Sequence, residues 1–78
     1  MPTVLRIGTY RFFFHSNEGN EPPHIHVQRD RALAKFWLET GNLSKSKHFA
    51  AHELTDIARL IAEKRTSLLE AWHEHYDG

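Results

Sequence analysis

The first half of the chain alternates hydrophobic and polar positions, a pattern typical of β-strands. Residues 4–7 and 10–15 are β-branched and aromatic runs separated by Gly8-Thr9, and this pairing predicts a β-hairpin. A two-residue connection would place one set of side chains on a common face: Leu5, Ile7, Tyr10, Phe12 and Phe14. The opposite face would then carry Arg6, Arg11, Phe13 and His15.

A second hairpin is predicted from residues 24–28 and 33–38, which flank the polar pair Asp30-Arg31. With an even number of connecting residues, the hydrophobic positions pair across the hairpin and face the core: Ile25 with Phe36, and Val27 with Ala34. The other face then carries a polar and aromatic set: His24, His26, Gln28, Lys35 and Trp37.

Three segments are expected to connect these elements without belonging to them. Residues 16–21 contain turn-forming residues and predict an exposed loop. Residues 39–42 are expected to close the sheet, and residues 43–48 to form a polar connection that carries lysines.

From about residue 50 the period of the hydrophobic pattern changes from two to 3.6, which predicts helix. One apolar stripe comprises Leu54, Ile57, Ala58 and Ile61, and a similar stripe comprises Leu68, Leu69, Trp72 and Tyr76. The charged residues 63–66 separate the two stripes, so the pattern fits one long helix or two shorter ones. Ser67 and Glu70 match a capping box, which favours a break at that point.

These elements predict an α+β domain that spans residues 1–78. Its four-stranded antiparallel sheet, made of two hairpins, would be covered on one face by the C-terminal helix or helices. The uncovered face would be basic and aromatic and would carry Arg6, Arg11, Phe13, His15, His24, His26, Lys35 and Trp37.

Composition narrows the chemistry that such a domain can perform. The 78 residues include no cysteine, which excludes disulfides and thiolate metal ligands. Ten basic residues balance ten acidic ones, which argues against a wholly basic nucleic-acid-binding protein. Neither a signal peptide nor a membrane span is apparent in the sequence, so a soluble cytoplasmic protein is expected.

The most distinctive stretch is Pro22-Pro23-His24-Ile25-His26, in which the diproline restricts how the chain enters the predicted strand. Because strand side chains alternate, the two imidazoles should leave the same face. Such a pair suits metal ligation, proton transfer or phosphate contact.

The sequence resembles the domain of unknown function 4160 family of small bacterial proteins. The resemblance covers nearly the whole chain and is carried by Met-Pro-Thr-Val at the start, Glu-Gly-Asn-Glu-Pro-Pro-His-Ile-His-Val, Ala-Lys-Phe-Trp-Leu-Glu and Leu-Leu-Glu-Ala-Trp-His-Glu. By this resemblance the motif positions are His24, His26, Lys35, Trp37, Trp72 and His73. The other histidines, His15, His48, His52 and His75, fall outside the motifs and are set aside as site candidates.

The resemblance also implies a gene context. Members of the family are commonly encoded beside another small protein, an arrangement interpreted as a toxin–antitoxin pair. The chain departs from the family at Ala50, where a serine is typical, and so lacks the expected helix cap opposite Glu53.

Binding of a partner is the function that we expect first. The half-covered sheet favours docking of a protein partner or self-association, with Glu18, Arg11, Trp37 and Trp72 as binding residues, although the helical spacing of Trp72 is more typical of a core residue. Arginine and aromatic side chains on a sheet also fit a face that binds single-stranded nucleic acid.

Two catalytic alternatives use the histidines. His24, His26 and His73 with water or a carboxylate, Glu18 or Glu21, would suit a divalent metal such as zinc. The same three histidines as acid and base, with Lys35 stabilising charge on a phosphate, would suit a ribonuclease-type toxin.

Overall fold

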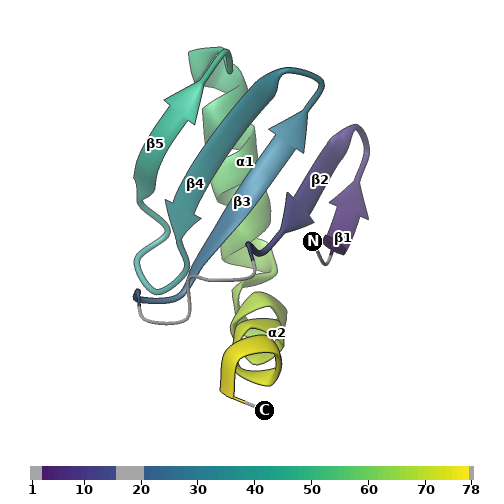
Figure 1. The fold of residues 1–78 in the computed structure, drawn as a ribbon. Helices are drawn as coiled ribbons and strands as arrows, with labels where there is room; N and C mark the ends of the chain where they lie inside the picture. Colours follow the sequence, from purple (N-terminus) through teal and green to yellow (C-terminus); the bar gives the residue numbers. More distant parts are fainter. Residues whose placement is uncertain (1–2, 16–20, 78) are drawn as a thin grey trace.

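The protein is a two-layer α+β structure in which five antiparallel strands are followed by two helices (Figure 1). The computed structural model describes residues 3–15 and 21–77. The elements in chain order are β1 (Thr3–Ile7), β2 (Tyr10–Phe13), β3 (His24–Arg29), β4 (Ala32–Trp37), β5 (Leu43–Lys47), α1 (Ala51–Glu63) and α2 (Arg65–Asp77). The strands lie side by side in chain order, α1 crosses one face of the sheet, and α2 continues beyond its end (Figure 1).

The first hairpin pairs β1 with β2 as the alternation predicts, with Ile7 opposite Tyr10 and Arg6 opposite Arg11. Its turn is Gly8-Thr9, and Gly8 has a φ of 58°, a left-handed conformation that glycine adopts without a steric penalty. The register shifts between Thr3 and Leu5, so the regular pairing is confined to the end of β1 next to the turn.

The second hairpin has the register expected from an even loop. Ile25 lies opposite Phe36, and Val27 lies opposite Ala34. The turn is Asp30-Arg31, in which Asp30 has a φ of 55°, a conformation that aspartate tolerates better than most residues.

The sheet has a fifth strand, so the expectation of four strands was wrong. Residues 43–48 were expected to be a polar connection, but Leu43–Lys47 forms β5 and pairs with β4. All five residues of β5 are exposed, so no hydrophobic alternation marks this strand in the sequence. The pairing with β4 that defines β5 is between backbone groups, which every residue type except proline can supply in full.

The core lies between the sheet and the helices and contains the hydrophobic positions that the two periodicities predict. Its buried members are Phe12, Phe14, Ile25, Val27, Ala34, Phe36, Leu38, Ile57, Ile61, Leu68 and Trp72. Both apolar helical stripes therefore face the core, which confirms the assignment of Trp72 as a packing residue.

The C-terminal region forms two helices that are separated at Lys64. Lys64 has φ −105° and ψ 11°, and its N–H donates to the carbonyls of Leu60 and Ile61. The break therefore comes three residues before the predicted capping box at Ser67. Over the described residues, neither helix combines the length and the apolar character needed to cross a membrane.

Ala50, the N-cap residue of helix α1, forms only half of a capping box. Ala50 has no side-chain oxygen to cap the helix, but its N–H donates to Oε1 of Glu53 at 3.0 Å. This hydrogen bond is the main cause of the lowered pKa of Glu53. Burial opposes it, and the guanidinium of Arg29 on β3, which forms a salt bridge with Glu53, lowers the pKa further. Glu53 thus ties the start of α1 to the sheet.

Replacing Ala50→Ser should stabilise the protein, because the hydroxyl can accept a hydrogen bond from the first turn and complete the capping box. We expect the free energy of unfolding to rise by about 1 kcal/mol in urea denaturation. Ala51→Ser, one residue further on and equally exposed, is the control and should not stabilise the protein.

Stability should also depend on the ionisation of Glu53. Because its pKa in the folded protein is lowered, its contribution is complete above the ordinary carboxyl value of 4.5 and is lost as the pH falls through the lowered value. Glu53→Gln should therefore be less stable than the unmodified protein at neutral pH, and the difference should shrink in acid. Urea midpoints measured between neutral and acidic pH test this. If the difference in stability stays constant over that pH range, the ionised carboxylate of Glu53 does not stabilise the protein.

Candidate functional site

The face of the sheet that α1 leaves uncovered presents a row of side chains that runs across four strands. Phe13 on β2 lies opposite His26 on β3, His26 opposite Lys35 on β4, and Lys35 opposite Lys45 on β5. We call this side of the sheet the open face. It matches the face that the sequence predicts to be basic and aromatic.

His24 and His26 point to this same side, as their spacing predicts, and their ring centroids are 5.2 Å apart. The two rings have different environments. His24 is 0% exposed, whereas His26 is partly exposed. His24 also contacts Trp37 at 5.7 Å edge to face and Trp72 of α2 at 4.9 Å. His24 is therefore a packing residue where the sheet meets α2.

The diproline segment supplies the hydrogen bond that orients His24. Nδ1 of His24 lies 3.0 Å from the carbonyl oxygen of Pro22, and since a carbonyl only accepts, Nδ1 carries the proton. The next carbonyl, that of Pro23, accepts a hydrogen bond from the N–H of Leu38 at 2.9 Å. Both prolines thus hold the entry into β3 through their carbonyl groups.

His15 forms a cluster with Phe13 and His26, here called the histidine cluster, although the sequence motifs give no reason to include it. Its ring lies 4.1 Å from that of His26, edge to face, and 5.4 Å from that of Phe13. Phe13 in turn stacks on His26 at 5.4 Å. The alternation of residues 11, 13 and 15 correctly placed His15 on this face, although it was set aside as a site candidate because it lies outside the motifs. The carbonyl of His15 also accepts a hydrogen bond from the hydroxyl of Tyr76, which joins this strand end to α2.

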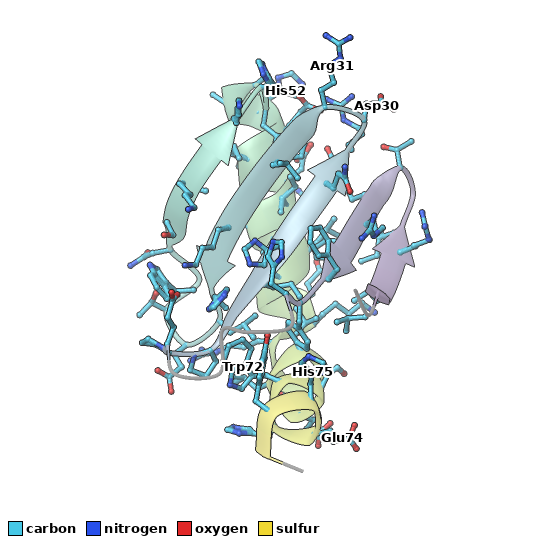
Figure 2. The ribbon with its side chains drawn as sticks, viewed as in Figure 1. Asp30, Arg31, His52, Trp72, Glu74 and His75 are labelled. Atoms are coloured by element: carbon cyan, nitrogen blue, oxygen red, sulfur yellow. The ribbon has the colours of Figure 1, made fainter. Side chains whose placement is uncertain are left out.

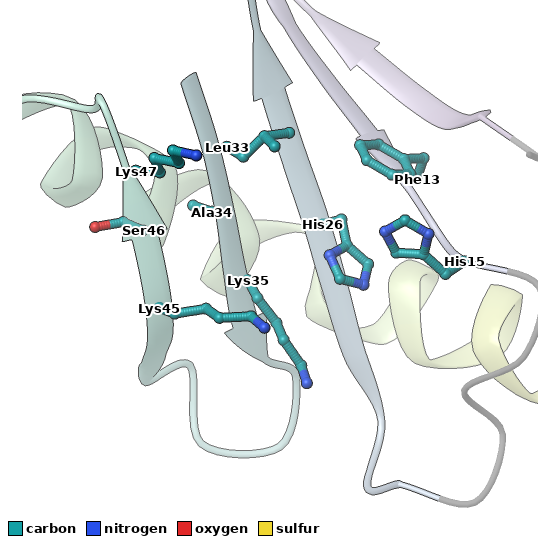
Figure 3. Close-up of a pocket in the computed structure, with 9 residues that line it drawn as sticks. All are labelled: Phe13, His15, His26, Leu33, Ala34, Lys35, Lys45, Ser46 and Lys47. Carbon is teal, nitrogen blue, oxygen red and sulfur yellow. The ribbon is translucent and has the colours of Figure 1, made fainter. Parts of the chain in front are cut away.

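Beside this cluster the open face contains a hollow with a volume of about 470 Å³ (Figure 3). The hollow is lined by Phe13, His15, His26, Leu33, Ala34, Lys35, Lys45, Ser46 and Lys47. Three of its side chains come from β5, whose residues were expected to be a connection. The sequence therefore did not predict that Lys45 and Lys47 would lie near the histidines.

The lysines of the hollow differ in how their charges are balanced. Lys35 is 8% exposed, its Nζ lies 2.7 Å from Oε1 of Glu21, and it lies 4.8 Å from the centre of the Trp37 ring. Lys45 and Lys47 are exposed, and no described acidic side chain forms a salt bridge with them. The positive charge of the hollow is thus concentrated on β5.

Four further residues were proposed from the sequence as site residues, Arg11, Trp72, His73 and Glu18, and none of the three that the structure describes lines the hollow. Arg11 lies beside it on β2, with Nη1 donating to Oε1 of Gln28 at 3.0 Å and its guanidinium 4.4 Å from the Phe13 ring centre. Trp72 is buried below the end of the sheet on α2 (Figure 2). His73 is exposed on α2. Glu18 lies outside the described residues.

The metal site expected from the sequence uses His24, His26 and His73 with Glu18 or Glu21, of which Glu18 lies outside the described residues. Within residues 3–15 and 21–77, no group of three or more histidine, aspartate or glutamate side chains is arranged to hold a metal ion. The described arrangement offers imidazole, ammonium and guanidinium groups, which can donate hydrogen bonds to an anion and, in the case of imidazole, exchange protons with it.

Comparison with known proteins gives a family but no activity. No curated protein and no solved structure matches the chain. Residues 9–73, which include the strands and helices that carry the hollow and the histidine cluster, match a family described as a domain of unknown function. The chain therefore belongs to the DUF4160 family.

Proposed function

We propose that this chain is the partner-binding component of a toxin–antitoxin-like pair and that it docks an acidic protein partner on its open face. The observation that carries this proposal is the hollow, which combines an exposed leucine, Leu33, with Lys45 and Lys47, to which no described acidic side chain is salt-bridged. An exposed apolar side chain surrounded by charge of one sign is typical of a surface that binds a partner.

The distribution of charge supports an acidic partner. Residues 1–50 contain seven basic and four acidic side chains, a net charge of +3, whereas residues 51–78 contain three basic and six acidic ones, a net charge of −3. The sheet and the helices thus carry opposite net charge, although the chain as a whole is neutral. A partner that docks on the sheet side is attracted more strongly if its own contact surface is negatively charged.

A protein fits this face better than a nucleic acid strand does. Single-stranded nucleic acids bind to sheets largely by stacking bases on exposed aromatic rings. Here Phe13 is 3% exposed, because His26 stacks on it and Arg11 covers it. The Phe13 ring is thus already engaged within the protein, and a base could stack on it only by displacing His26 or Arg11.

Reversing the charge of the hollow should abolish tight docking. We expect Lys45→Glu with Lys47→Glu to weaken binding to the small protein encoded beside this one at least about tenfold, measured by titration calorimetry. The control is Arg31→Glu with Arg59→Glu, which changes the net charge equally but lies away from the hollow. Equal weakening by both pairs, or the absence of a complex with the unmodified protein, would contradict the proposal.

Histidine-based cleavage of RNA is a second candidate, and the contact between His15 and His26 is the observation that favours it. The two rings lie 4.1 Å apart, close enough for one neutral imidazole and one protonated imidazole to act on the same phosphate. The neutral ring would remove the proton of a ribose 2′-hydroxyl as its oxygen attacks phosphorus. The protonated ring would give its proton to the departing 5′ oxygen, leaving a 2′,3′-cyclic phosphate. Lys45 would stabilise the negative charge on phosphorus.

This candidate predicts metal-independent cleavage of labelled single-stranded RNA in the presence of a chelator. We expect His26→Ala to slow cleavage about 100-fold or more, because it removes one of the two proton-transfer groups. His52→Ala, an exposed histidine on α1 at the far end of the molecule (Figure 2), should leave the rate unchanged. If the unmodified protein does not cut RNA, or the two variants cut equally well, the catalytic role fails.

A further inference from the structure

Strand β5 is the outermost strand of the described sheet on its side, and all five of its residues are exposed. In the strand order of the described residues, β5 pairs with β4 on one edge only. The backbone groups of an edge strand that point away from the sheet can pair with an extended segment of another chain. This edge borders the hollow, because Lys45, Ser46 and Lys47 line it.

The side chains of β5 alternate in a way that would select such a segment. Lys45 and Lys47 lie opposite Lys35 and Leu33, whose side chains are on the open face, whereas Ser46 lies opposite the buried Ala34. Side chains directly opposite each other on neighbouring strands have Cβ atoms about 4.5 to 5.5 Å apart. A strand added to β5 would therefore bring every second side chain close to the two lysines.

We propose that β5 accepts an extended acidic segment of the partner as a sixth strand, with alternate Glu or Asp side chains paired to Lys45 and Lys47. This inference rests on the proposed docking function and specifies its mode. Backbone hydrogen bonds along β5 supply affinity, and the lysines select the charge and the register of the segment.

The same lysines disfavour a second copy of this chain as the occupant. Antiparallel pairing of two β5 strands would set basic side chains on adjacent strands, and like charges in that position are destabilising. Lysines on an edge strand are a common device against such self-pairing. An acidic segment converts that repulsion into attraction, so β5 discriminates between the two occupants.

The other edge of the sheet lacks these features. Strand β1 carries a single charged residue, Arg6, and its pairing with β2 is irregular between Thr3 and Leu5. Charge complementarity therefore assigns the acidic segment to β5.

Synthetic peptides test this mode directly. The probe is an eight-residue peptide of alternating Glu and Val, compared by fluorescence anisotropy with a peptide of the same composition in which the four Glu residues are contiguous. Two further probes carry N-methyl groups on every second residue, in one register or in the other. Only alternate N–H groups of an added strand face β5, so one methylated peptide should bind at least about tenfold more weakly than the other.

A charge-swap variant guards against misinterpreting a simple loss of binding. The double variant Lys45→Glu with Lys47→Glu should no longer bind the alternating Glu peptide and should instead bind an alternating Lys peptide. A misfolded protein would bind neither. The matched control Arg31→Glu with Arg59→Glu should keep the preference of the unmodified protein.

Two results would overturn the inference, and they have different consequences for the proposed function. If the acidic peptides bind but methylation in either register has the same effect, the partner docks on the open face without forming a strand, and only this inference fails. If the alternating Glu peptide binds no better than the contiguous one while an oligouridylate binds tightly, the face recognises nucleic acid and both proposals fail.

Discussion

The pairing register of β3 with β4 decides what each face of the sheet presents. Ile25 opposite Phe36 and Val27 opposite Ala34 direct hydrophobic side chains toward the helices, so His24 and His26 must point the other way. A slip by one residue would exchange the two sets and bury the imidazoles beneath α1. The hydrophobic effect of burying Ile25 and Val27 thus also positions the histidines that lie between and beside them.

The junction between the sheet and α2 gives the two neighbouring histidines different environments. Trp72 packs against His24 and meets the ring of Phe14 edge to face at 5.4 Å, and the hydroxyl of Tyr76 donates to the carbonyl of His15. His24 is enclosed by Trp72 and Trp37, whereas His26 lies two residues further along β3, where no helix covers the open face. One sequence motif therefore supplies both a packing residue and a surface residue.

Charge on the open face follows from which lysines have partners. Lys35, in the middle of the sheet, is nearly buried and is compensated by Glu21, as burial of a charged group requires. Lys45 and Lys47 lie on the edge strand, where water can solvate their charges, so no compensation is needed. The uncompensated charge thus collects at the edge of the sheet, which is also the place where another chain can pair.

The sequence by itself determined both hairpins, the two hydrophobic helical stripes and the common side of His24 and His26, because periods of two and 3.6 report directly which positions are buried. It did not reveal β5 or the break at Lys64, and although alternation placed His15 on the uncovered face, the motifs gave no reason to count it in the site. Strand β5 buries none of its side chains, and no glycine or proline marks the break between the helices. Only the tertiary structure brought Lys45 and Lys47 beside the histidines, because backbone pairing between distant segments depends on which edge is left open and leaves no pattern in the side chains.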